Sequence, residues 1–141
     1  MKRIILTFIL MFLLVGCSVV NYDKINCDKL IKKLENKETF ILLVYNDSDE
    51  SKLLENTLSK VLEDNDLEAY TINSNSISEE KENELRKYFS YENISIIFFK
   101  DGVDPSKLSH ITDTSITSDK LEKHLINLGF IQSDDTEKTS K

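Results

Sequence analysis

Residues 40–52 read FILLVYNDSDESK, and this stretch decides the fold. Its first six residues are apolar without interruption, which is typical of a strand buried on both faces of a sheet. A short polar turn follows, and Ser48–Asp64 then has apolar residues at helical spacing. The inward positions of this helix are Leu54, Leu58, Val61 and Leu62. A buried strand that leads directly into an amphipathic helix predicts an α/β domain.

Helices and strands alternate on both sides of this unit. Before it, we expect a helix with an apolar face formed by Cys27, Leu30, Ile31 and Leu34. After it, we expect a strand at Leu67–Asn73, a polar helix at Ser78–Tyr91 held by Leu85, Tyr88 and Phe89, and a buried strand at Ile94–Phe99. A turn at Asp101-Gly102, a weak edge strand at Lys107–Thr112 and a closing helix at Ser118–Leu128 that stops at Gly129 complete the prediction. The first two strands are joined through a helix and should be parallel, whereas the last two should be antiparallel. The predicted fold class is therefore a three-layer α/β sandwich with a mixed four-stranded sheet flanked by helices.

The N-terminus has the pattern of an export signal. Lys2 and Arg3 precede an apolar run from Ile4 to Val15, and the small residue Gly16 follows. The tetrapeptide Leu14-Val15-Gly16-Cys17 resembles the lipobox of bacterial lipoproteins. The resemblance implies cleavage after residue 16, a diacylglyceryl group on the Cys17 thiol and, in many members, an acyl chain such as palmitate on the new amine. The alternative is an uncleaved membrane anchor.

These signals divide the chain into four parts: a lipoprotein signal peptide at 1–16, a lipidated tether at 17–24, a folded domain at 25–130 and a polar, disordered tail at 131–141. Loss of Lys2 and Arg3 changes the formal charge from −7 to −9. Such an acidic chain is a poor partner for nucleic acid, and anionic lipids repel it, so the lipid on Cys17 must provide the membrane contact. We expect the protein on the extracytoplasmic side of the cell membrane.

The chain offers few groups for metal or disulfide chemistry. Its two cysteines are Cys17 and Cys27, so lipidation of the first leaves the second without an internal disulfide partner. His110 and His124 lie far apart, are expected at the surface or its boundary, and form no zinc pattern with a second thiol. Cys27 shares an apolar helix face and is expected to be a buried structural residue. The alternative is a reactive thiol at the start of a helix.

A calcium loop is also rejected. Asp47, Asp49 and Ser51 have the alternate spacing of an EF-hand, but Lys52 and Leu58 stand where that loop requires glycine and glutamate. We therefore expect no metal and no cofactor.

Three stretches resemble the thioredoxin fold, across residues 25–130. Phe40–Lys52 resembles the family's strand that runs into Trp-Cys-Gly-Pro-Cys-Lys, and Ile94–Gly102 (ISIIFFKDG) resembles its Pro-Thr, apolar run and Phe-Lys-Asn/Asp-Gly. Ser118–Phe130 is similar to its C-terminal helix. The N-terminal helix before the first strand and the charged helix at Ser78–Tyr91 look more like the bacteriocin-accessory branch of thioredoxin-like proteins. The resemblance implies a thioredoxin-like sandwich.

The departures from the family concern its chemistry. Ser48 and Ser51 replace both motif cysteines, and Ile94 replaces the cis-proline. A serine hydroxyl cannot form the mixed disulfide that thiol–disulfide exchange requires. We expect Ser48 to be a helix N-cap, Ser51 to be a solvated first-turn residue, and Ile94 to be trans at the start of the buried strand.

Two functions compete at this stage. The first is a redox-inactive, membrane-anchored accessory module that binds a protein or peptide, such as an exporter, a secreted peptide or an envelope enzyme. Its expected binding tip consists of Asp47, Ser48, Asp49, Glu50, Ser51, Asn93 and Ile94. The second is an enzyme related to thiol–disulfide oxidoreductases that uses Cys27 or a partner's cysteine. A purely structural or immunity lipoprotein is a third possibility. The glutamates at 79, 80, 82 and 84 are expected to be solvated, with a partner-binding face as the alternative.

Overall fold

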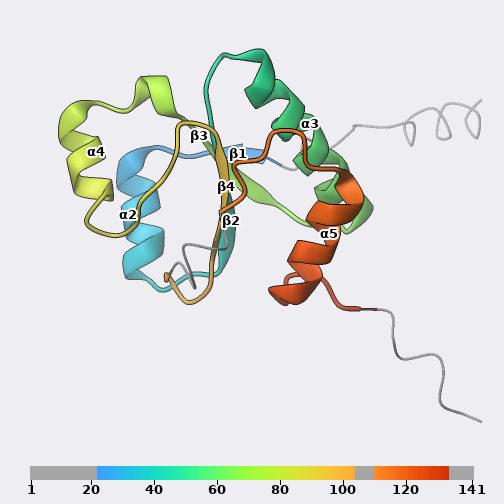
Figure 1. The fold of residues 1–141 in the computed structure, drawn as a ribbon. Coiled ribbons are helices and arrows are strands. Elements are labelled where there is room, and N and C mark those ends of the chain that lie inside the picture. Colours follow the sequence, from blue (N-terminus) through green and yellow to red (C-terminus); the bar gives the residue numbers. More distant parts are fainter. Residues whose placement is uncertain (1–21, 104–109, 134–141) are drawn as a thin grey trace, which may run out of the picture.

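The structure, a computed structural model, describes residues 22–103 and 110–133. Within these residues the chain forms four strands, four α-helices and one 3₁₀ turn (Figure 1). In chain order they are β1 (Tyr22–Lys24), α2 (Cys27–Glu35), β2 (Phe40–Tyr45), α3 (Asp49–Asp64), β3 (Ala69–Asn73), η1 (Ser74–Ser76), α4 (Glu79–Leu85), β4 (Ser95–Phe99) and α5 (Ser118–Asn127). No helix in this part of the chain is both long and apolar enough to cross a membrane.

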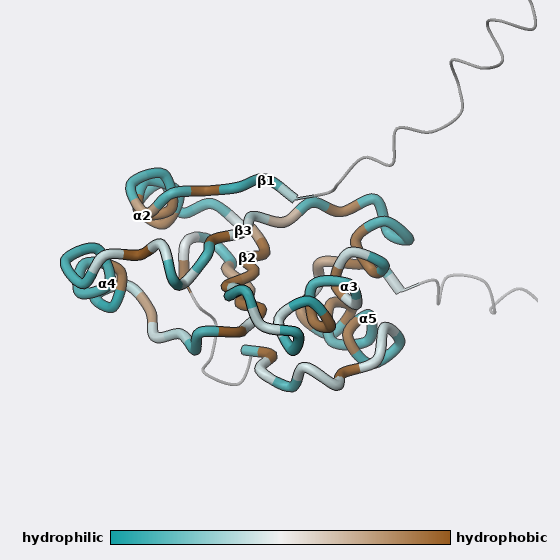
Figure 2. Tube along the Cα trace, turned by 90° about the horizontal axis from the view of Figure 1, so that it is seen from above, coloured by the Kyte–Doolittle hydropathy of each residue, from teal (hydrophilic) through white to brown (hydrophobic). Residues whose placement is uncertain are grey.

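The four strands form one mixed sheet in the order β1-β3-β2-β4. β3 is parallel to both β1 and β2, whereas β4 is antiparallel to β2. Helices α2 and α4 cover one face of the sheet, and α3 and α5 cover the other (Figures 1 and 2). The predicted three-layer α/β sandwich is confirmed, and its arrangement is thioredoxin-like.

The core has two halves, one on each face of the sheet. Alternate residues of β2 point to opposite sides: Leu42 and Val44 pack toward α2 and α4, while Ile41 and Leu43 pack toward α3 and α5. Figure 2 shows the apolar segments gathered between the helix pairs and the hydrophilic segments outside. Helices cover both faces of β2 and β4, which explains why both strands are apolar without interruption. The prediction that these two strands are buried on both faces is confirmed.

The predicted tether is wrong at its C-terminal end. Tyr22–Lys24 is not a connecting segment but strand β1, in register with β3 from Tyr22↔Ala69 onward. The Tyr22 hydroxyl also donates a hydrogen bond to the Glu55 carbonyl oxygen of α3 at 2.7 Å. These contacts hold the short, polar strand β1 at the edge of the sheet. The predicted signal peptide at 1–16 and Cys17 lie outside the described residues.

Of the edge strand predicted at Lys107–Thr112, residues 110–112 are described, and they contribute a single bridge to the sheet. Ile111 exchanges two backbone hydrogen bonds of 2.9 Å with Ile96 of β4, in the antiparallel sense expected. Residues 107–109 lie outside the described part. The fourth strand of the sheet is therefore β1.

The polar helix is shorter than predicted, because α4 ends at Leu85. The chain turns there so that Phe89 can pack edge-on against Phe99, with ring centroids 5.0 Å apart. Leu85 and Phe89 are buried as expected. Tyr88 is not a core residue, since it is 44% exposed and its hydroxyl donates to Glu35 Oε1 at 3.0 Å.

The C-terminal end of the domain also differs slightly from the prediction. Gly129 has a φ of +77° directly after α5, which agrees with its expected role as a helix stop. Phe130 and Ile131 then pack against the core on the α3–α5 face. The packed chain therefore includes residue 131, which was assigned to the tail, and residues 134–141 lie outside the described part.

Candidate binding tip

The carboxyl ends of β2 and β3 meet the N-terminus of α3 at one end of the sheet, at the top of Figure 1. We call this end the tip and define it by the predicted residues 47–51, 93 and 94. Ser74 joins its parts, since its hydroxyl lies 3.1 Å from the Tyr45 carbonyl oxygen and 3.3 Å from that of Asn93. The one hydroxyl proton can be donated to either oxygen. The structure thus brings together the two segments that the sequence placed in one site.

A closed set of hydrogen bonds forms the turn from β2 into α3. Ser48 is the N-cap of α3, as predicted, and its Oγ accepts from the Ser51 backbone N–H at 3.2 Å. Ser51 Oγ in turn accepts from the Asn46 N–H at 3.1 Å, and Asn46 Oδ1 accepts from the Ser48 N–H at 2.9 Å. Three side chains therefore satisfy three backbone donors of the turn, two of which, the N–H groups of Ser48 and Ser51, belong to the start of the helix.

Ser51 is not the solvated residue that the sequence predicted. Its exposure is only 1%, because the third position of α3 faces the sheet. A buried hydroxyl is favourable only when it is hydrogen-bonded, and the Asn46 N–H supplies that bond. The sequence contained one signal for this role: Asn46 and Ser51 flank an N-cap serine, which is the composition of a polar capping turn.

The acidic side chains of the tip face solvent. Asp47, Asp49 and Glu50 are exposed, and the Asp49 side chain has 96% of its surface free even though Lys52 lies 3.2 Å from its carboxylate. Carboxylates at a helix N-terminus interact favourably with the helix dipole, so they stabilise α3 while leaving a negative surface. This negative charge opposes formation of a thiolate or alkoxide at the tip.

The second segment of the tip is built differently from the prediction. Ile94 does not begin β4, which starts at Ser95; it is half-buried and packs against the α3–α5 core. Every peptide bond within the described residues is trans, including that of Ile94. Asn93 is exposed beside it, while Ser95 is fully buried and its hydroxyl donates to the Glu92 carbonyl oxygen at 3.2 Å.

No activated nucleophile is formed at the tip as far as the structure describes it. The Ser48 hydroxyl oxygen accepts a backbone N–H, and no histidine or lysine of the described residues is hydrogen-bonded to it. No three histidine, cysteine, aspartate or glutamate side chains gather as a metal site in the described ranges. The tip, as far as it is described, is therefore a capped turn with an acidic rim.

Cys27 lies on the other face of the sheet from α3. It is the first residue of α2, is half-buried and packs against the α2–α4 core, so it is less buried than the predicted structural cysteine. Burial raises the pKa of its thiol, and the nearby Lys81 ammonium opposes this rise without cancelling it. The thiol is thus less ionised than an ordinary cysteine.

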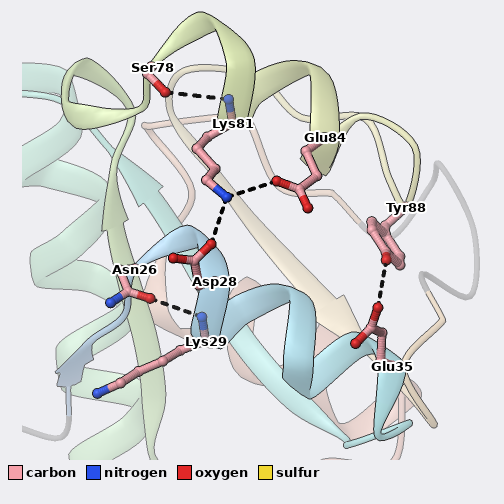
Figure 3. Close-up of polar contacts among 8 residues, drawn as sticks. All are labelled: Asn26, Asp28, Lys29, Glu35, Ser78, Lys81, Glu84 and Tyr88. Atoms are coloured by element: carbon pink, nitrogen blue, oxygen red, sulfur yellow. Dashed lines mark hydrogen bonds and ion pairs between the residues drawn. The ribbon is translucent and has the colours of Figure 1, made fainter.

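A polar contact that the sequence did not predict joins α4 to α2 (Figure 3), and its Lys81 ammonium is the one that acts on the Cys27 thiol. The Lys81 ammonium lies 2.7 Å from Asp28 and 3.0 Å from Glu84. The hydrogen bond from Lys81 is the main reason that the pKa of the Asp28 carboxyl falls below its ordinary value. Together with the Tyr88–Glu35 bond, this contact joins α4 and the turn after it to α2.

The acidic run of α4 is only partly solvated. Glu82 pairs with Arg86 at 2.6 Å, and Glu84 belongs to the Lys81 contact, whereas Glu79 and Glu80 are exposed. His124, expected at the boundary, is half-buried overall, and its Nε2 is buried beside the Phe98 ring with no hydrogen-bond partner among residues 22–103 and 110–133.

No family model matches this chain, and no curated protein matches it in sequence.

Proposed function

We propose that this chain is a lipid-anchored extracytoplasmic protein whose thioredoxin-like domain binds a protein or peptide partner at the tip and does no redox chemistry itself. One observation carries the proposal: Ser48 and Ser51, which replace the cysteines of the resembling family, both form hydrogen bonds that fix the turn into α3. The turn is kept rigid while the atoms for thiol–disulfide exchange are absent from it.

The membrane part of the proposal rests on the lipobox-like sequence that ends at Cys17. Two or more acyl chains hold a protein on a membrane, whereas a single chain gives only reversible binding. A diacylated and N-acylated Cys17 therefore anchors the domain on the extracytoplasmic side. The acidic rim of the tip is repelled by anionic lipid and is left available to a protein partner.

The rival function is a thiol–disulfide oxidoreductase that acts through Cys27. Its raised thiol pKa argues against this function, because the thiolate is the attacking species. Reduction of insulin, followed by turbidity, should proceed at the same rate with the parent domain and with Cys27→Ser. A rate that depended on Cys27 would restore the enzyme and refute the binding module.

Photo-crosslinking in living cells tests the binding function. A photoreactive residue at Asp49 should give one discrete adduct, whereas the same residue at Lys123, exposed on α5, should give none. Mass spectrometry of the adduct then identifies the partner. Absence of an adduct at Asp49, with the protein present at its normal level, contradicts the proposed use of the tip.

A further inference from the structure

The attachment of the domain to its predicted anchor is short. The sequence predicted a tether as far as Lys24, but β1 begins at Tyr22, so five residue steps separate Cys17 from the first residue of the fold. At most about 3.5 Å of chain per residue limits this connection to about 17 Å, whatever its conformation.

Tyr22 is fixed in place by contacts to two different elements. Its backbone is in register with Ala69 of β3, and its hydroxyl donates to the Glu55 carbonyl oxygen at 2.7 Å. Burial raises the pKa of the phenol, so the hydroxyl keeps its proton and this bond at every physiological pH. The Ile25 N–H, which donates to the Thr71 carbonyl oxygen at 2.9 Å, closes the other end of β1.

The sheet register also bounds the distance from the anchor to the tip. Ala69, level with Tyr22, lies four residues before Asn73, and Asn73 is level with Tyr45, two residues before the tip. Four residues of strand span about 13 Å, and the two strand spacings from β1 to β2 add about 10 Å across the sheet, so Tyr45 lies about 16 Å from Tyr22. With the tether limit and the two residues from Tyr45 to Asp47, the start of the tip is within about 40 Å of the lipidated residue.

Because the tether is short and β1 is fixed, the geometry points to a partner that resides in the same membrane and presents its contact segment within about 40 Å of Cys17. This inference rests on the proposed function of the tip. A partner in the same membrane meets the tip within the layer above the bilayer that the tether allows the domain to explore, and the local concentration in that layer falls as a longer flexible tether deepens it. A partner dissolved in the surrounding medium gains nothing from a short tether.

The test lengthens the tether in the full, lipidated protein. A flexible segment of twenty Gly and Ser residues is inserted between Val20 and Asn21, and the same segment after Ser133 is the matched control. Photo-crosslinking from Asp49 is compared in cells, with each adduct normalised to the anchored protein in the membrane fraction. The N-terminal insertion raises the residue steps from five to twenty-five, which deepens the explored layer about twofold for a flexible chain, so we expect its adduct to fall about twofold while the control stays at the parent level.

The possible results separate the two proposals. Equal adduct yields from the parent and both insertion variants would overturn the membrane-resident partner while leaving the binding function intact. No adduct in the parent itself would overturn the binding function and, with it, this inference. A fall in both insertion variants would show that added chain disturbs the protein in general, and would also refute the dependence on tether length.

Discussion

Ser51 Oγ accepts the backbone N–H of Asn46 at 3.1 Å from a position that is 1% exposed. This bond joins the end of β2 to the first turn of α3, at the point where the resembling family places its second motif cysteine. The serine at this position is therefore part of the structure of the turn, and substitutions there should affect folding before they affect any surface.

Ser51→Ala should lower the free energy of unfolding by about 1–3 kcal/mol, because the buried Asn46 N–H loses its partner. Ser48→Ala removes an N-cap and should cost about 1 kcal/mol. Urea unfolding followed by circular dichroism measures both. The exposed Ser90→Ala is the control and should stay within about 0.5 kcal/mol of the parent. A Ser51→Ala value equal to that control would mean that water replaces the hydroxyl.

Gly102→Ala should be among the most destabilising single changes at a turn. Gly102 has a φ of +72°, and a Cβ there would lie 2.3 Å from the Leu34 carbonyl oxygen, which is backbone and cannot move aside easily. Gly129→Ala is the matched control: its φ is +77°, but the Cβ would meet only the end of the flexible Lys100 side chain at 3.0 Å.

Both glycine substitutions share the left-handed backbone cost of about 1–2 kcal/mol. The difference between their thermal unfolding midpoints therefore isolates the clash with Leu34. We expect Gly102→Ala to lower the midpoint further than Gly129→Ala. Equal midpoints would show that the chain between α2 and β2 adjusts to the added methyl group.

Cys27 should react slowly with iodoacetamide in the folded domain. Its raised thiol pKa means that a smaller fraction is thiolate at pH 8 than in the same protein unfolded in urea, and the thiolate is the form that reacts. Lys81→Ala should slow the reaction further, because the Lys81 ammonium lowers this pKa. A rate above that of the unfolded chain, or a faster reaction in Lys81→Ala, would contradict the assigned electrostatics.

The Asp28–Lys81 contact predicts a pH dependence at the acidic end of the scale. The pKa of Asp28 lies below its ordinary value of 3.8, chiefly because Lys81 donates a hydrogen bond to the ionised form. The contact therefore supports the fold above that ordinary value, and its contribution is lost as the pH falls through the lowered pKa. Carbon-13 NMR titration of the Asp28 carboxyl should give a midpoint below 3.8 in the parent and a higher one in Lys81→Met. An unchanged midpoint would remove Lys81 as the cause.

Most of the fold was predictable because its strongest signals are local. The sequence alone indicates that β2 and β4 are buried, because both are continuous apolar runs. It also indicates the buried face of α3, because Leu54 and Leu58 recur at helical spacing. β1 was not predictable, since Tyr22–Lys24 carries no apolar pattern and its place depends on β3, far along the chain. Its short length and polar residues resemble a linker in every local respect.

The candidate site was predicted in position but not in its internal contacts. The N-cap role of Ser48 follows from residue type and spacing, and the structure confirms it. The burial of Ser51 and the linking role of Ser74 depend on how the turn meets the sheet and the loop at Asn93, which is a tertiary relationship. The Asp28–Lys81 pair joins residues on different helices, and periodicity within either helix contains no information about it.

We expect β1 to join the sheet late in folding. In the described sheet its one neighbouring strand is β3, so the Tyr22↔Ala69 pairing can form only when the chain through residue 71 is present, and closing so long a loop is entropically costly. In the proposed lipoprotein, we therefore expect the newly exported domain to begin with a longer free segment at the membrane. Its distance from the bilayer would become fixed only when Tyr22 docks on α3.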